Sequence, residues 1–270
     1  MSYTEKDHTW ALCAYGESPY LEECIRSLER QTVRSRILIS TSTPSPWLRD
    51  MAEKHGIPLY SHEGGGIGRD WNAAYDLTET KLVTIAHQDD LYEPEYAEKM
   101  LEYLNRAKDP IFFFTDYAEL RDGKRVEENR NLRIKRLMLT PLKWKGLWNS
   151  RFTRRRILSL GCPICCPAVT YVKERAGDSI FSTEMKVSLD WDQWEKQSRK
   201  RGAFVYCPQR LMLHRVHEGS ETTRMIENHQ RGSEDLEMFR RFWPEWAARI
   251  LAKKYSASEK SNEENHHAQK

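Results

Sequence analysis

Hydrophobic and polar positions in the first half of the chain alternate between short apolar runs and amphipathic stretches. The apolar runs have the length of buried strands and cover residues 9–15, 35–41, 57–62 and 82–86. Stretches with apolar residues at helical spacing lie between them, at residues 18–32, 46–56 and 67–78. This alternation predicts an α/β fold with a parallel sheet covered by helices. Ligands of such sheets bind at the carboxyl ends of the strands.

Capping residues indicate where these helices begin and end. Ser18 followed by Pro19 predicts the start of the first helix at Ser18, and Gly56 predicts the end of the second helix.

The second half of the chain has a less regular pattern. It predicts a strand over residues 110–120, a strand within 161–174, a helix over 188–202 and further strand structure in 203–220. Residues 233–255 have a helical pattern that Pro244 interrupts. The polar segment 256–270 is predicted to be disordered. We therefore expect one catalytic domain over residues 1–255, with helices at its C-terminal end.

Composition indicates a water-soluble globular protein, with 39% apolar and 31% charged residues. No apolar run is long enough to span a bilayer, and the N-terminus lacks the pattern of a signal peptide. The six cysteines have no disulfide-framework spacing, so we expect reduced thiols and a cytoplasmic location. The "CPICC" run has no second cysteine pair at zinc-site spacing, which argues against zinc.

Positive charge is concentrated in one segment. Residues 121–156 contain 13 Lys or Arg and 3 Asp or Glu, although the net charge of the whole chain is only +3. Such a segment suits an anionic partner, such as nucleotide phosphates, nucleic acid or a lipid surface. A solvated surface without a ligand explains the same composition.

Two acidic pairs are candidates for chemistry. Asp89 and Asp90 directly follow the apolar run 82–86, where they could hold Mg²⁺ or Mn²⁺ against a diphosphate or could cap the next helix. Asp190 and Asp192 open the helix over 188–202, where one of them could act as a general base or serve as the N-cap. His217, and less plausibly His214, could add an imidazole ligand to the metal or form an ordinary loop hydrogen bond.

A co-linear set of motifs resembles the bacterial family-2 inverting glycosyltransferases. These motifs are "ALCAYGESPYLEECIRSLERQT", "ILISTST", "GIGRDWNAA", "IAHQDDLYEP", "LDWDQW" and "HRVHEGS", from about residue 8 to about residue 220. The resemblance implies a GT-A fold, in which a Rossmann-like nucleotide-sugar-binding half over about 8–120 precedes an acceptor-binding half over about 121–220. It also implies a nucleotide-sugar donor, most often a UDP-sugar, with Mn²⁺ or Mg²⁺.

The resemblance assigns roles by position. Asp190 matches the catalytic base, Asp90 and His217 match metal-binding positions, and Asp89 matches a ribose or metal contact. Further donor-binding residues implied by the resemblance are Ala14, Tyr15, Glu17, Thr41, Arg69 and Asn72.

Three positions depart from the family pattern. His87 replaces the first Asp of D-x-D-D, and Leu189 replaces the usual Glu before the base. The second strand ends in "STST" where many relatives have an acid against uracil, which leaves the nucleotide base open.

The basic segment falls where the acceptor half begins, and it contains Trp144 and Trp148. With Trp191 and Asp192, these residues are our candidates for acceptor binding. The composition suits a glycan or lipid-linked saccharide acceptor used in cell-surface glycan synthesis, with peripheral contact to the anionic inner face of the plasma membrane. We expect no nucleic-acid partner.

Two other functions are considered. A sugar nucleotidyltransferase would share the sheet and the metal-binding acids, but it should have a glycine-rich, basic first loop, whereas "AYGESPY" has one glycine and no cation. A nucleic-acid-binding module would use residues 121–156 but would leave both acidic pairs unexplained. A non-catalytic relative of the transferases is a third reading.

Overall fold

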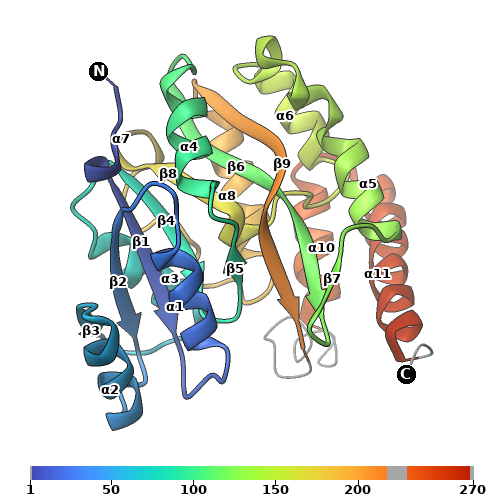
Figure 1. The fold of residues 1–270 in the computed structure, drawn as a ribbon. Coiled ribbons are helices and arrows are strands. Elements are labelled where there is room, and N and C mark those ends of the chain that lie inside the picture. Colours follow the sequence, from blue (N-terminus) through green and yellow to red (C-terminus); the bar gives the residue numbers. More distant parts are fainter. Residues whose placement is uncertain (1, 218–229, 268–270) are drawn as a thin grey trace.

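The computed structural model describes residues 2–217 and 230–267 (Figure 1). Its centre is a sheet of nine strands in the order β3-β2-β1-β4-β8-β6-β9-β5, with β7 paired to β6. The strands are β1 (His8–Ala14), β2 (Arg36–Thr41), β3 (Leu59–Ser61), β4 (Leu82–His87), β5 (Leu91–Tyr92), β6 (Pro110–Arg121), β7 (Lys124–Val126), β8 (Val169–Val172) and β9 (Ala203–Val216).

The first four strands form the parallel half of the sheet that the sequence predicts. β1 pairs in parallel with β2 and β4, and β2 pairs in parallel with β3. β8 is antiparallel to both β4 and β6, whereas β6 and β9 run parallel to each other. The prediction of an α/β fold with a parallel sheet in the first half of the chain is therefore confirmed.

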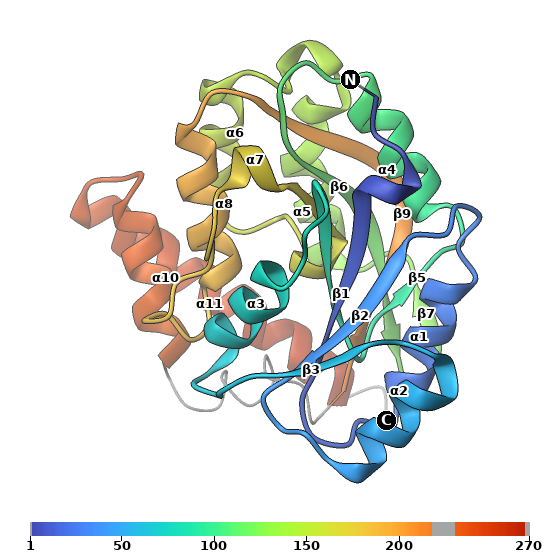
Figure 2. The ribbon, with the colours of Figure 1, turned by 90° about the vertical axis from the view of Figure 1, so that its left-hand side faces the viewer.

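Helices cover both faces of this sheet, with α1 and α4 on one face and α3 and α8 on the other (Figure 2). The helices are α1 (Leu21–Glu29), α2 (Pro46–His55), α3 (Ile67–Asp76), α4 (Tyr96–Asn105), α5 (Arg130–Leu139), α6 (Arg151–Leu158), α7 (Lys173–Ala176), α8 (Leu189–Arg199), α10 (Gln230–Arg240) and α11 (Glu245–His267). Because the sheet is covered on both sides, its central strands are apolar on both faces.

β6 shows how this double covering works. Phe112 packs against Trp194 of α8, with ring centroids 5.1 Å apart, while Phe113 packs against Tyr96 of α4 at 5.8 Å. Successive side chains of a strand point to opposite faces. The run of three phenylalanines therefore fills both layers of the core.

Local signals place α2 correctly and α1 only in part. The side chain of Ser45 caps α2, Pro46 is its first residue, and Gly56 ends it in the left-handed conformation with φ of 62°. By contrast, α1 begins at Leu21 rather than at Ser18: the Ser18 hydroxyl accepts a hydrogen bond from the backbone N–H of Tyr20, in the turn before the helix, and donates one to Asp89.

The C-terminal helices break where the sequence predicts, since α10 ends at Arg240 and α11 begins at Glu245, directly after Pro244. Composition predicts disorder over residues 256–270, whereas α11 continues in the structure to His267. Good helix formers such as Ala257, Glu259 and Lys260 follow Tyr255 and favour this continuation. Within the described ranges, no helix has the length and hydropathy of a membrane span.

Gly68 lets α3 approach the segment that leads into α8. A Cβ atom at this position would lie 2.1 Å from the carbonyl oxygen of Ser182 and 2.7 Å from Cδ2 of Leu189. Backbone and core atoms cannot move aside cheaply, so the close approach requires glycine.

We expect Gly68→Ala to destabilise the protein by about 1–3 kcal/mol, because the added methyl group overpacks this contact. Gly232→Ala in α10 is the matched control, since its Cβ would meet no atom within 4 Å. There alanine should raise the free energy of unfolding by about 0.5–1 kcal/mol through helix propensity. Thermal and denaturant unfolding measure both variants, and equal effects would contradict the assigned contact.

Candidate active site

Asp90 joins the end of β4 to β9. Its side chain is buried, and Oδ1 accepts hydrogen bonds from the backbone N–H of Arg215 (2.9 Å) and from Nδ1 of His214 (3.0 Å). Burial alone would lower the pKa of His214, but the Asp90 carboxylate reverses this effect and raises the pKa above its usual value. The role of Asp90 as a metal ligand stays a prediction: Asp90 is in the lining of neither cleft described below, and its Oδ2 is buried without a hydrogen-bond partner among the described residues.

Asp89 points the other way, into a cleft beside β1. Its Oδ1 accepts a hydrogen bond from the hydroxyl of Ser18 (2.7 Å), and its Oδ2 lies 3.2 Å from Nε2 of His217. The carboxylate and the imidazole thus converge on the cleft wall. Both are ligand types that Mn²⁺ accepts, and Mg²⁺ prefers the carboxylate. In the part of the chain that the structure describes, no three His, Cys, Asp or Glu side chains gather into a metal-binding cluster.

Arg215 links the Asp89 backbone to residues of the segment that leads from β1 into α1. Its Nε donates to the carbonyl oxygen of Asp89 (2.8 Å), and one terminal nitrogen donates to Oε2 of Glu23 (2.6 Å). The guanidinium carbon lies 4.2 Å from the ring centroid of Tyr20, a cation–π distance. The loop between β1 and α1 is therefore tied to the β4 end.

The first cleft, of about 830 Å³, opens at the carboxyl ends of β1, β2 and β4. Ala14, Tyr15, Glu17, Asp89 and His217, all predicted from the sequence, lie in its lining.

Three residues predicted to bind the donor lie outside this lining. Thr41 is buried, and its hydroxyl accepts a hydrogen bond from the backbone N–H of Thr43. Arg69 is an exposed residue whose side chain packs over Gly65. Asn72 is buried, and its amide makes two hydrogen bonds to the backbone of Phe181.

Two residues that the sequence analysis missed line the first cleft. Asp70 of α3 accepts a hydrogen bond from the Ser42 hydroxyl (3.0 Å), and burial raises the pKa of Asp70. Trp71 stacks on His87, with ring centroids 4.9 Å apart and planes inclined by 18°. Burial lowers the pKa of His87, which favours its neutral form. The position of Asp70 in the first turn of a helix that follows a strand end is the signal that could have identified it.

A second cleft, of about 200 Å³, contains Asp190 and shares Ile67, Trp71 and His87 with the first. Asp190 lies in the first turn of α8, and its Oδ1 accepts a hydrogen bond from the backbone N–H of Trp191 (2.7 Å). The thiol of Cys162 lies 3.4 Å from Oδ2 of Asp190 and donates a hydrogen bond to it. The two clefts therefore meet at a wall of three side chains, with Asp89 on one side and Asp190 on the other.

Asp192 does not share the position of Asp190. It is buried, and its carboxylate pairs with Lys196 (2.7 Å) and Arg241 (2.6 Å), outside both cleft linings. Positions i and i+2 of an α-helix are about 200° apart around its axis, so Asp190 and Asp192 point to different sides of α8. The role predicted for Asp192 in acceptor binding stays a prediction, and the two ion pairs hold its carboxylate outside both cleft linings.

The tryptophans predicted for acceptor binding have three different environments. Trp148 is buried and its Nε1 donates to the carbonyl oxygen of Leu142 (2.7 Å), whereas Trp144 is exposed and lines neither cleft. Trp191 lies in the wall of the second cleft, although its side chain is buried and its Nε1 donates to Leu158.

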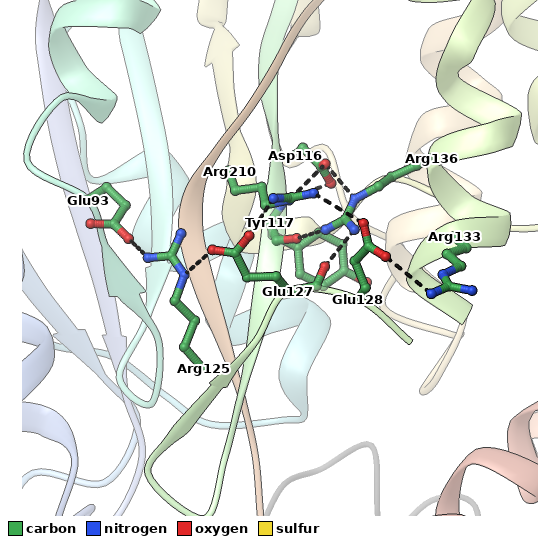
Figure 3. A network of polar contacts seen from close by, with 9 residues as sticks. All are labelled: Glu93, Asp116, Tyr117, Arg125, Glu127, Glu128, Arg133, Arg136 and Arg210. Atoms are coloured by element: carbon green, nitrogen blue, oxygen red, sulfur yellow. Dashed lines mark hydrogen bonds and ion pairs between the residues drawn. The ribbon is translucent and has the colours of Figure 1, made fainter. Parts of the chain in front are cut away.

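Part of the basic segment is neutralised within the protein (Figure 3). Arg136 donates to Asp116 (2.6 Å), Arg133 pairs with Glu128, and Arg125 pairs with both Glu93 and Glu127. Arg210 of β9 also pairs with Glu127. These contacts fasten β7 and α5 to β5, β6 and β9. The composition of residues 121–156 therefore overstates the charge available to a ligand.

The α/β sheet therefore has two adjoining clefts at its strand ends, which is where ligands of such sheets bind. The sequence model of "Glycosyl transferase family 2" matches residues 9–181, and the chain belongs to this family. This membership argues against the nucleotidyltransferase and the nucleic-acid-binding module. A search of curated protein sequences finds no significant match.

Solved structures of glycosyltransferases have the same fold. S. aureus TarS (residues 1–349), in complex with UDP-GlcNAc, gives a TM-score of 0.59 at 14% identity, over 92% of this chain and 71% of that chain. The mannosyltransferase PcManGT from Pyrobaculum calidifontis, in complex with GDP-Man and Mn²⁺, gives a TM-score of 0.62 at 15% identity, over 94% of this chain and 70% of that chain. At these identities the likeness establishes the fold alone.

The two neighbouring acids should respond differently to substitution. We expect Asp90→Asn to cost about 1–3 kcal/mol of stability, because it disrupts a buried hydrogen-bonded pair. Asp89→Asn, at the cleft surface, should change the free energy of unfolding by less than about 0.5 kcal/mol. Denaturant unfolding of both variants measures the difference, and a larger loss for Asp89→Asn would contradict the assignment.

The cost of Asp90→Asn should also depend on pH. The raised pKa of His214 means that the charged pair stabilises the native state below the unfolded pKa, and that this contribution disappears as pH rises through the folded pKa. The stability difference between wild type and Asp90→Asn should therefore shrink between mildly acidic and alkaline pH. A difference that grows with pH would contradict the proposed charge on His214.

Proposed function

We propose that this protein transfers a sugar from a UDP-sugar to a hydroxyl group of a saccharide acceptor, with inversion at the anomeric carbon. The observation that carries the proposal is the meeting of two clefts at Ile67, Trp71 and His87. One cleft has the Asp89–His217 pair on its wall, and the other has Asp190. A donor in the first and an acceptor in the second would meet at this boundary.

The first cleft suits the nucleotide part of the donor. Its wall includes the loop from Ala14 to Tyr20 and the hydroxyls of Ser42 and Thr43 at the end of β2. The strand end "STST" has no acid, but the carboxylate of Asp70 lies beside it and accepts a hydrogen bond from the Ser42 hydroxyl. A carboxylate accepts hydrogen bonds from the ring N–H of uracil and equally from guanine. The choice of UDP over GDP therefore follows the family resemblance and requires a direct test.

Asp89 and His217 are the residues that would hold a divalent cation. Two metal-ligating side chains would leave the remaining ligand positions of the cation to diphosphate oxygens and water. Mg²⁺ and Mn²⁺ commonly bind nucleotides in this way. When bound, such a cation neutralises charge on the departing diphosphate. Arg215 fixes the Asp89 backbone, so the carboxylate is already oriented before a ligand arrives.

Asp190 is the candidate general base. Two hydrogen bonds, from Trp191 N–H and the Cys162 thiol, orient its carboxylate in the second cleft. It would take the proton of the acceptor hydroxyl as that oxygen attacks the anomeric carbon and the bond to the diphosphate breaks. A single displacement of this kind inverts the configuration of the anomeric carbon.

We further propose that the enzyme acts in cell-surface glycan synthesis, on the cytoplasmic side and in peripheral contact with anionic lipid. Leu137, Trp144 and Phe152 are each at least 70% exposed and lie among Lys and Arg residues of the basic segment. Exposed apolar side chains beside cations suit the interface of an anionic membrane. Salt-insensitive liposome binding, or none, would contradict the electrostatic part of this contact.

Donor binding is tested by thermal unfolding with UDP, GDP and dTDP, each with and without Mn²⁺. We expect UDP to raise the melting temperature in the presence of Mn²⁺, and EDTA to abolish the shift, because binding to the native state stabilises it by mass action. Asp89→Asn should lose the metal-dependent part of the shift. A metal-dependent response to GDP alone would replace UDP in the proposal, and no response to any nucleotide would reject it.

Catalysis is tested by Asp190→Asn. We expect turnover to fall roughly 10²–10⁴-fold while metal-dependent nucleotide binding is retained, because only the proton acceptor is lost. Glu184→Gln, an exposed acid in the segment before α8, is the control and should keep wild-type turnover. Wild-type activity in Asp190→Asn would exclude Asp190 as the base.

A further inference from the structure

Lys135 brings a positive charge into the wall of the second cleft. It projects from α5, and its Nζ donates a hydrogen bond to the phenol oxygen of Tyr117 (2.9 Å). Tyr117 and Asp190 line the same cleft, and so does Tyr255 of α11. An ammonium group from the basic segment therefore lies on the wall that also carries the candidate base.

Its neighbours on α5 have different partners. Arg133 pairs with Glu128 and Arg136 with Asp116 (Figure 3). Lys135 makes no ion pair with any carboxylate of residues 2–217 and 232–256, for which side chains are described. A charge that is partly removed from water is costly without an anionic partner. The carboxylates of Asp190 and Asp235 line the same cleft, but neither forms an ion pair with Lys135, so its ammonium group is available to a negative group of a bound molecule.

Lys135 is also close to the reacting groups. Burial raises the pKa of the Cys162 thiol, the charge of Asp190 raises it further, and the charge of Lys135 lowers it. Lys135, Cys162 and Asp190 line the same cleft, and the Cys162 thiol contacts Asp190 at 3.4 Å. A group bound by Lys135 would belong to a molecule whose hydroxyl is within reach of Asp190.

We propose that the acceptor saccharide carries an anionic group, a carboxylate or a phosphate, which Lys135 and the Tyr117 hydroxyl bind. This inference rests on the proposed transferase function and adds the charge class of its acceptor. Nζ retains two further N–H donors beyond the one given to Tyr117, and the phenol keeps its own hydrogen to donate. Hydrogen bonds from a charged donor to an anionic oxygen are about twice as strong as neutral ones.

The test uses the whole chain of 270 residues, with UDP and Mn²⁺ present so that the proposed donor cleft is filled. Three matched probes are titrated at up to millimolar concentration: p-nitrophenyl β-D-glucoside, the corresponding glucuronide and the corresponding glucoside 6-phosphate. We expect at least one anionic probe to bind roughly tenfold or more tightly than the neutral glucoside. The glucuronide and phosphate arms separate a carboxylate from a phosphate as the preferred group.

Variants assign the preference to Lys135. Lys135→Met should lose roughly 10- to 100-fold in affinity for the anionic probe and little for the neutral one, whereas Lys135→Arg should keep most of the preference. Tyr117→Phe should reduce the affinity for the anionic probe by a smaller factor than Lys135→Met does. Lys143→Met, an exposed lysine of the same segment, is the control and should match the wild type.

The outcomes separate this inference from the proposed function. Loss of metal-dependent UDP binding in the wild type would reject the transferase proposal itself. With UDP binding intact, equal binding of neutral and anionic probes, no binding of either anionic probe, or an unchanged preference in Lys135→Met would each overturn the inference. Melting temperatures of the variants, measured with UDP and Mn²⁺, show whether each one is folded.

Discussion

The site depends on one buried carboxylate that links two strands far apart in the sequence. Asp90 follows β4 and accepts hydrogen bonds from His214 and Arg215 of β9. This link fixes the chain direction at the β4 end, so that Asp89 turns toward the first cleft, while His214 lies in the wall of the second. Disturbing Asp90 would therefore affect both clefts together. A buried charged pair is rarely a large net source of stability, and its effect here is to determine geometry.

Much of the N-terminal half follows from local signals in the sequence. The alternation of apolar runs and amphipathic stretches identifies β1 to β4 with α1 to α3, and Ser45 and Gly56 set the ends of α2. The position of acids directly after a buried strand also locates the first cleft, because the carboxyl ends of parallel strands share one edge. These features depend on residues that are close in the sequence, so a pattern can reveal them.

Features that depend on distant partners could not be predicted in this way. The run "HQDD" does not show which acid turns inward, because that choice depends on β9, more than a hundred residues later. The cations of residues 121–156 are counted easily, but their pairing with Glu93 and Asp116 comes from the fold. The different directions of the Asp190 and Asp192 side chains could have been predicted, since two residues that are two positions apart in a helix point to different sides.

The match to the family ends at residue 181, yet the second cleft takes Asp190, Asp235 and Tyr255 from beyond that point. The Tyr255 ring of α11 also packs against Trp191, so the last helix is built into this wall. The second cleft is therefore lined by residues from both sides of the point where the family match ends. If the donor binds in the first cleft and the acceptor in the second, as proposed, substitutions in the C-terminal helices would change which acceptor binds and leave the donor cleft intact.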